Sequence, residues 1–150
     1  MPIVLADLLD SRQVALRLGA VDKAGALHEI VQLLAGNGKL KDAVRFRKDL
    51  LAHEEARPTG VEAGVALTHL RTDLVAEIVI GIGRSKKGVP FHDGAIAKLV
   101  FVIGVPQRLA NEYLIVVGGL ARLLRDDDVR KTLLAAKSPD EFIKALKQSS

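Results

Sequence analysis

Residues 98–105 read Lys-Leu-Val-Phe-Val-Ile-Gly-Val, and this stretch decides the expected fold. An apolar run without polar alternation is typical of a strand that is covered on both faces of its sheet. The run from Leu99 to Pro106 is far shorter than the ~20 apolar residues that a membrane-spanning helix needs. The segment therefore predicts the central strand of a sheet that carries helices on both sides.

Helical patterns lie before and after this strand. Asp22 precedes a helix-spaced apolar series, and Ser138-Pro139-Asp140-Glu141 has the form of a capping box with proline at the first helical position. Within the second helix, Val44, Leu50 and Leu51 are expected to face inward. The expected helices are Ile3–Leu9, Lys23–Ala35, Asp42–Glu55, Tyr113–Leu124, Asp126–Ala136 and Pro139–Lys147.

Shorter extended patterns complete the sheet. They are expected at 14–18, at 65–69 and at 75–82, and a polar turn is expected from Gly83 to Asp93. Gly81–Gly88 is rich in glycine and lysine but lacks the spacing of a phosphate-binding loop, so a solvated hairpin turn is expected there. Strands interleaved with helices predict a single α/β domain over residues 1–150.

Composition narrows the possible functions. The chain has 150 residues and a net charge of +4, with 49% hydrophobic residues, 3% aromatic residues and no cysteine. The absence of cysteine excludes disulfides, thiol nucleophiles and cysteine-based metal sites. Few aromatic side chains disfavour binding of nucleic-acid bases by stacking. The first ten residues lack the basic start of a signal peptide, so a cytoplasmic protein without membrane insertion is expected.

The segment 53–71 holds the densest group of reactive side chains. It contains two His, three Glu, two Arg, two Thr and two Gly. His69 stands at the end of a strand pattern, where α/β sheets place functional side chains, and a neutral imidazole is a nucleophile. The side chains that can donate to phosphate oxygens are Thr59, Thr68, Arg57 and Arg71. The alternative is an ordinary surface histidine at a strand end.

These residues resemble the active-site stretch of the enzyme IIA components of the bacterial sugar phosphotransferase system. The similarity is to the fructose/mannitol class, which includes nitrogen-regulatory members, and it extends over nearly the whole chain. The family pattern is Arg-Glu, then Ser-Thr-Gly, then Gly-Ile-Ala-(Ile or Leu)-Pro-His. The residues that match it without a gap are Glu54, Thr59, Gly60, Gly64, Val65, Ala66, Leu67 and His69.

The resemblance implies a mixed β-sheet flanked by helices and a phosphohistidine relay. The residue matching the family's active histidine, His69, would accept a phosphoryl group from the histidine-containing phosphocarrier protein. It would pass the group to a sugar-transporter domain or hold it as a signal to a regulated protein. Thr59 would be the hydroxyl partner of the histidine or phosphate, Glu54 would organise the site, and Gly60 and Gly64 would shape the loop. No cofactor or metal is required.

The chain departs from the family pattern beside the active histidine. His53 stands in place of the family's arginine, Tyr113 in place of a second histidine, and Thr68 in place of the proline before His69. An arginine grips phosphate with a permanent charge, which a histidine lacks when neutral. Two hypotheses follow: Arg57 or Arg71 replaces the lost arginine, or the protein is a regulatory or protein-binding module that is not phosphorylated.

Other functional interpretations of the sequence carry less weight. His53, His69 and His92 lack the spacing of a zinc site. His92 is expected either in a loop that borders the His69 site or in an exposed turn, and His28 is expected to be solvated on the surface. The basic groups around Arg45 and Lys86 are expected to be solvated rather than bound to nucleic acid. Gly118-Gly119 predicts either close packing of its helix on the sheet or close approach to the His69 pocket.

Overall fold

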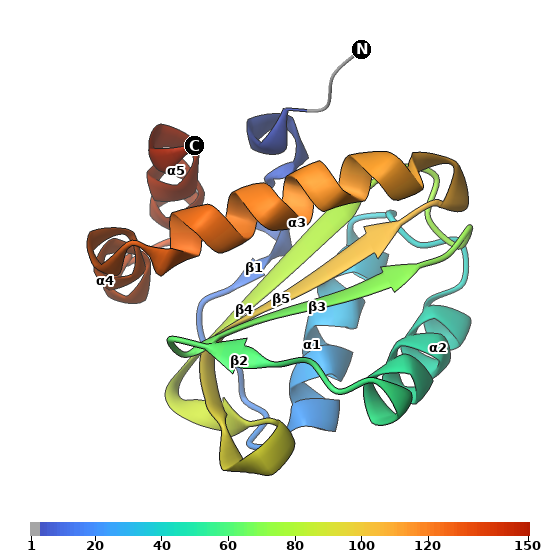
Figure 1. The fold of residues 1–150 in the computed structure, drawn as a ribbon, viewed down its shortest axis with the longest axis horizontal. Helices are drawn as coiled ribbons and strands as arrows, with labels where there is room; N and C mark the ends of the chain where they lie inside the picture. Colours follow the sequence, from blue (N-terminus) through green and yellow to red (C-terminus); the bar gives the residue numbers. More distant parts are fainter. Residues whose placement is uncertain (1–3) are drawn as a thin grey trace.

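The structure is a computed structural model that describes residues 4–150. Its centre is a five-stranded sheet in the order β1-β4-β5-β3-β2 (Figure 1). The β1–β4 and β3–β5 pairs are parallel, and the β4–β5 and β2–β3 pairs are antiparallel. The expected α/β fold with a mixed sheet is therefore confirmed. The strands are β1 (Val14–Ala15), β2 (Val61–Glu62), β3 (Val65–Arg71), β4 (Val79–Pro90) and β5 (Ile96–Val105).

Helices cover both faces of the sheet. On one face, apolar side chains of α1 and α2 pack on the strands, and on the other face those of α3, α4 and α5 do so. Figure 1 shows α3 crossing the sheet diagonally. Each helix of residues 4–150 falls short of the length or the hydropathy that a membrane span requires. The α-helices are α1 (Lys23–Gly36), α2 (Ala43–Ala56), α3 (Ala110–Arg125), α4 (Asp127–Ala135) and α5 (Pro139–Ser149), and the 3₁₀ helices are η1 (Leu5–Leu8), η2 (Ser11–Gln13), η3 (His92–Gly94) and η4 (Gln107–Leu109).

Strand β5 joins the two apolar layers, as its sequence predicts. Leu99, Phe101 and Ile103 pack toward α3 and α5, whereas Val100 and Val102 pack toward α1 and α2. All five side chains are at most 1% exposed. The uninterrupted apolar run therefore reflects burial on both sides of the sheet.

The local signals at helix ends are confirmed. The side chain of Asp22 accepts a hydrogen bond from the Gly25 N–H at the start of α1, and Ser138 caps α5 through the Glu141 N–H. The predicted inner face of α2 is partly wrong, because Val44 is 71% exposed. Phe46 and Leu50, one turn apart, are the residues of α2 that are fully buried.

Strand β4 differs most from expectation. The strand predicted at 75–82 begins only at Val79, and the polar turn predicted at 83–93 is instead strand as far as Pro90. The glycines in it permit close packing: a Cβ on Gly81 would lie 2.6 Å from Cγ2 of Ile30. Residues that resemble turn signals are thus required for contact between the sheet and α1.

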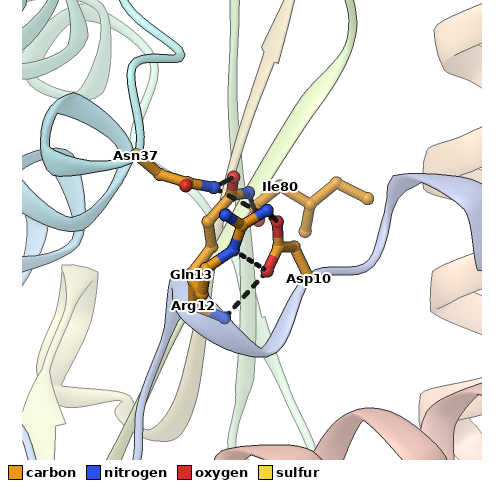
Figure 2. A network of polar contacts seen from close by, with 5 residues as sticks. All are labelled: Asp10, Arg12, Gln13, Asn37 and Ile80. Atoms are coloured by element: carbon orange, nitrogen blue, oxygen red, sulfur yellow. Dashed lines mark hydrogen bonds and ion pairs between the residues drawn. The ribbon is translucent and has the colours of Figure 1, made fainter.

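The N-terminal segment is held by a polar network (Figure 2). Asp10 accepts hydrogen bonds from the backbone and guanidinium of Arg12, which lower the pKa of that carboxyl to about 2. Asn37 donates to Asp10 and, at 2.7 Å, to the side-chain oxygen of Gln13. The side-chain nitrogen of Gln13 in turn donates to the Ile80 carbonyl. The network therefore joins η2 to the end of α1 and to β4.

The remaining differences are small. The helix predicted at Ile3–Leu9 is the 3₁₀ turn η1, and Ile3 lies outside the described residues. The strand predicted at 14–18 is paired only at β1, after which the Leu18 N–H donates to the Arg84 carbonyl. Both interpretations of Gly118-Gly119 are wrong, since a Cβ at either position would meet nothing within 4 Å.

Candidate functional site

His69 lies near the carboxyl end of β3, opposite Ile103 of β5. Successive side chains of a strand point to opposite faces, so His69 faces α3 while the buried Thr68 faces α2. The His69 ring is half-buried. The structure therefore brings His69 to a pocket and leaves Thr68, predicted to border the site, on the other face of the sheet.

Two further rings flank His69. The centroid of the His53 ring, near the end of α2, lies 6.1 Å from that of His69. The Tyr113 ring on α3 lies 5.6 Å away at an interplanar angle of 31°, and the Arg71 guanidinium carbon lies 5.8 Å from the Tyr113 ring centroid. The residues that depart from the family pattern are thus the immediate neighbours of His69.

Ring nitrogens on this side of the site are without partners. The Nδ1 atoms of His53 and His69 are both buried, and among residues 4–150 neither has a partner in full hydrogen-bond geometry, although the Leu67 backbone still acts on the His69 ring. Burial lowers the pKa of His69, with smaller contributions in the same direction from His53 and Arg71. The backbone of Leu67 and the Glu54 carboxylate act in the opposite direction. Burial therefore favours the neutral form of the ring, in which an imidazole is a nucleophile.

Glu54 organises the loop between α2 and β2. Its carboxylate is 2% exposed and accepts hydrogen bonds from the Thr59 N–H and the Thr59 hydroxyl, both at 2.6 Å. The Lys23 ammonium lies 3.4 Å from the same carboxylate. Because the Thr59 hydroxyl donates its hydrogen bond to Glu54, the side chain of Thr59 can only accept a hydrogen bond from His69 or from a phosphoryl group that carries a proton.

A pocket of about 400 Å³ opens above these residues. Two arginines stand on its rim: Arg57 at the end of α2 and Arg125 at the end of α3, the latter 3.5 Å from the Glu62 carboxylate. The pocket residues used below are His53, Arg57, Thr59, Gly60, His69 and Arg125. A neutral imidazole beside cationic side chains suits the transfer of a phosphoryl group, which needs alignment and charge stabilisation.

The two glycines of the motif have different positions. Gly60 lines the pocket. Gly64, with a φ of +79°, occupies the hairpin turn between β2 and β3 beside Ala63, whose φ is +53°. Two positive φ values in succession define the turn type that matches the twist of a hairpin. Gly64 thus shapes the hairpin that leads into β3 and does not line the pocket.

Sequence reasoning missed three charged residues of the site. Lys23 reaches Glu54 from α1, while Glu62 and Arg125 meet across the pocket rim. Lys23 and Arg125 lie far from the motif in sequence, and nothing in their local patterns marks them. Their positions follow from the packing of α1 and α3 on opposite faces of the sheet.

The other histidines stand apart from this pocket. His92 lies in the exposed turn η3, as one of its interpretations predicted. His28 is half-buried, and the Arg47 guanidinium donates to its Nδ1 at 2.9 Å, so its predicted solvated position is wrong. Among residues 4–150, no three His, Asp or Glu side chains are grouped in a way that could hold a metal ion.

Comparison with known proteins gives a consistent result. The model of the family described as "Phosphoenolpyruvate-dependent sugar phosphotransferase system, EIIA 2" matches residues 7–149. The chain is 33% identical to the fructose-specific EIIABC component of Bacillus subtilis over 146 residues, which are 96% of this chain and 23% of that protein. The chain thus spans about a quarter of that relative.

Two stand-alone proteins are similar over most of their length. The fructose-specific EIIA component of Haloferax volcanii is 34% identical over 118 residues, or 77% of each chain. The crystal structure of the nitrogen regulatory protein IIA-Ntr of Neisseria meningitidis superposes with a TM-score of 0.85 at 26% identity. That superposition covers 95% of this chain and 98% of the other.

Proposed function

The chain belongs to the EIIA 2 family of the sugar phosphotransferase system, and we propose that residues 1–150 form one such domain, which carries a phosphoryl group on His69. Proteins of this family relay phosphoryl groups in sugar uptake or in nitrogen regulation. Their partners are phosphocarrier proteins and IIB domains. In the proposal, the histidine-containing phosphocarrier protein is the donor, and a sugar-transporter domain or a regulated protein is the recipient.

The observation that carries the proposal is the environment of the His69 ring. Its Nδ1 is buried, while the ring as a whole lines the pocket, so Nε2 is the nitrogen available for attack. Burial lowers the pKa of His69 and so favours the neutral ring; with the proton of that ring on Nδ1, the Nε2 lone pair is free. In the proposed step, the bond between Nε2 and phosphorus forms as the bond between phosphorus and the donor's ring nitrogen breaks. The Nδ1 proton stays in place.

The surroundings of His69 supply the charge that the step requires. Arg57 and Arg125 stand on the pocket rim, and neither Arg57 nor Arg71 is within 4 Å of a carboxylate among the described residues. A guanidinium binds phosphoryl oxygens through two hydrogen bonds. In this proposal, Arg57 takes the part of the arginine that His53 replaces. Glu54 holds the loop that carries Arg57 and Thr59.

The direct test is mass spectrometry of the intact protein after incubation with phosphoenolpyruvate, the first enzyme of the phosphotransferase system and the phosphocarrier protein. We expect one acid-labile phosphoryl adduct on the wild type and none on His69→Ala. A family member labelled in the same reaction controls for the donor proteins. An unlabelled wild type beside a labelled control would refute the proposal.

The contribution of Arg57 is tested by the rate of the same reaction. We expect Arg57→Ala to slow labelling by about tenfold, because one charge-assisted contact to the phosphoryl oxygens is lost. Arg45→Ala, on the exposed face of α2, should react at the wild-type rate. Normal labelling of Arg57→Ala would assign the supporting charge to Arg71 or Arg125 instead.

A second candidate is a protein-binding module on the same fold that is not phosphorylated. The observation in its favour is the pair of rings, His53 and Tyr113, which stand beside His69 where the family pattern has an arginine and a histidine. Titration of His69 by NMR with and without inorganic phosphate separates the candidates. A phosphate-dependent shift of the His69 titration supports the carrier, whereas identical curves support the binding module.

A further inference from the structure

A larger cavity lies at the opposite edge of the sheet from the His69 pocket. Its volume is about 1140 Å³, and its walls are the linker 16–21 after β1, the second half of β4 and residues 134–137 at the end of α4. In Figure 1 the blue linker and the yellow-green end of β4 lie at the lower part of the view, away from the tip of β3. We call it the basic cavity.

The charge of the basic cavity has one sign. No carboxylate lines it, and none of its six cationic side chains lies within 4 Å of a carboxylate among residues 4–150. The six positive charges of these side chains exceed the net charge of the whole chain, which is +4. The cationic residues are Arg17, Arg84, Lys86, Lys87, Lys98 and Lys137.

Two acidic side chains that contact the walls of the cavity are already occupied. Glu29 accepts hydrogen bonds from the Gly19 and Ala20 N–H groups, and Glu141 accepts one from the Lys137 N–H. Both carboxylates therefore accept hydrogen bonds from the backbone of residues that line the cavity. Neither carboxylate forms an ion pair with a cationic side chain of the cavity.

Hydrogen bonds from Arg84 hold the floor of the basic cavity in place. The Arg84 guanidinium donates to the carbonyls of Leu16, Leu133 and Ala136, which ties β4 to the linker and to the end of α4. Burial lowers the pKa of Arg84, as does the adjacent Arg17, while Glu141 opposes this. The cationic groups thus gather at a fixed place where a bound anion would relieve their mutual repulsion.

A bulge in β4 displays the two lysines at the rim. The register with β5 shifts between Arg84 and Val89, and Gly88 has a φ of +89°. The Gly88 N–H donates to the buried Ser85 hydroxyl at 3.0 Å, which closes the bulge around Lys86 and Lys87. Bulges of this kind redirect side chains and are common beside functional sites.

From this arrangement we propose that the basic cavity binds a small polyanion carrying two or more phosphoryl groups. Five cationic side chains, held around one concavity with Arg84 in its floor, match several closely spaced negative charges. None of the described residues that line the cavity is aromatic, so nucleic-acid bases have no side chain there on which to stack. The volume exceeds that of one phosphate ion and accommodates a linked series of phosphoryl groups.

This inference goes beyond the proposed function and concerns a different part of the molecule. His69 pairs with Ile103, whereas Arg84 pairs with Leu99, four residues earlier on β5 and on its other side. Four residues of strand correspond to about 13 Å. Binding in the basic cavity therefore requires no phosphorylation of His69.

The experiment measures binding of inorganic tripolyphosphate to the full chain by isothermal titration calorimetry at low and at moderate salt. We expect saturable binding that weakens as salt rises. Lys86→Gln/Lys87→Gln should raise the Kd by about tenfold or more, because two charge-assisted contacts are lost. His69→Ala should bind as the wild type does, which separates this result from the test of phosphorylation.

The matched control is Lys39→Gln/Lys41→Gln, which removes two exposed lysines from the connection between α1 and α2. Its Kd should stay within twofold of the wild type. An undetectable interaction at low salt, or equal weakening in both double variants, would overturn the proposal. Tighter binding of a short DNA duplex than of tripolyphosphate would overturn it as well, in favour of a nucleic-acid surface.

Discussion

On the side of the pocket formed by the α2–β2 loop, the Glu54 carboxylate is engaged by Thr59 and Lys23, whereas the ring nitrogens beside it at His53 and His69 are not engaged in this way. Glu54 accepts two hydrogen bonds from Thr59 at 2.6 Å and lies 3.4 Å from the Lys23 ammonium. Within the part of the chain that the structure describes, the Nδ1 atoms of His53 and His69 have no partner in hydrogen-bond geometry. The engaged side follows the family pattern and the other departs from it. Loop anchoring and phosphoryl chemistry are therefore separable properties of this site.

The largest effect on this contrast is expected when Glu54, which anchors the α2–β2 loop, loses its carboxylate. Glu54→Ala should lower the free energy of unfolding by about 2–4 kcal/mol, because two charge-assisted hydrogen bonds are lost and the Thr59 N–H is left unpaired. Urea denaturation measures the change. Glu55→Ala, its exposed neighbour, should change stability by less than about 0.5 kcal/mol. Equal losses in the two variants would mean that Glu54 does not anchor the loop.

A smaller effect is expected when only the hydroxyl bond is removed. Thr59→Val keeps the shape of the side chain but deletes the hydrogen bond from Oγ1 to Glu54. We expect a loss of about 2 kcal/mol in the same urea measurement, in the range for a hydrogen bond to a charged group. A loss as large as that of Glu54→Ala would mean that the Thr59 N–H and Lys23 add nothing to the anchor.

The same change at Thr68 should act in the opposite direction. Its hydroxyl is fully buried, faces α2 and has no hydrogen-bond partner in residues 4–150. Thr68→Val replaces an unpaired buried oxygen by a methyl group, so we expect stability to rise by about 1 kcal/mol. A fall in stability would reveal a polar partner of Thr68 and would weaken the contrast between engaged and unengaged groups.

How far the sequence predicts this molecule depends on the range of each contact. The apolar run at β5 and the caps of α1 and α5 are local signals, and they predict these elements well. The part of strand β4 after Ile82 is missed because Gly83 resembles a turn residue, whereas its small size permits contact with Leu18 and with Ile30 of α1. That requirement is visible only after the sheet and helix have been packed together.

The residues of the site also fall into those that lie in one sequence motif and those that tertiary packing brings to it. His69, Glu54 and Thr59 come from one contiguous motif, and the structure brings Glu54 and Thr59 into hydrogen-bond contact. Lys23 and Arg125 join them from helices on opposite faces of the sheet, so no spacing in the sequence indicates them. The sequence also places Thr68 beside His69, and strand alternation then separates their side chains.

The finest test of the comparison is the titration of His69. Burial lowers its pKa below the ordinary value of 6.5, so NMR should give a midpoint below 6.5. Because the unfolded chain binds the proton more readily, this group contributes stability that is complete above pH 6.5 and is lost as the pH falls below it. Arg71→Gln should raise the midpoint, since Arg71 contributes to the lowering. A wild-type midpoint at or above 6.5 would show that the ring is protonated more easily than its burial implies, and Nε2 would then be a poorer phosphoryl acceptor near neutral pH.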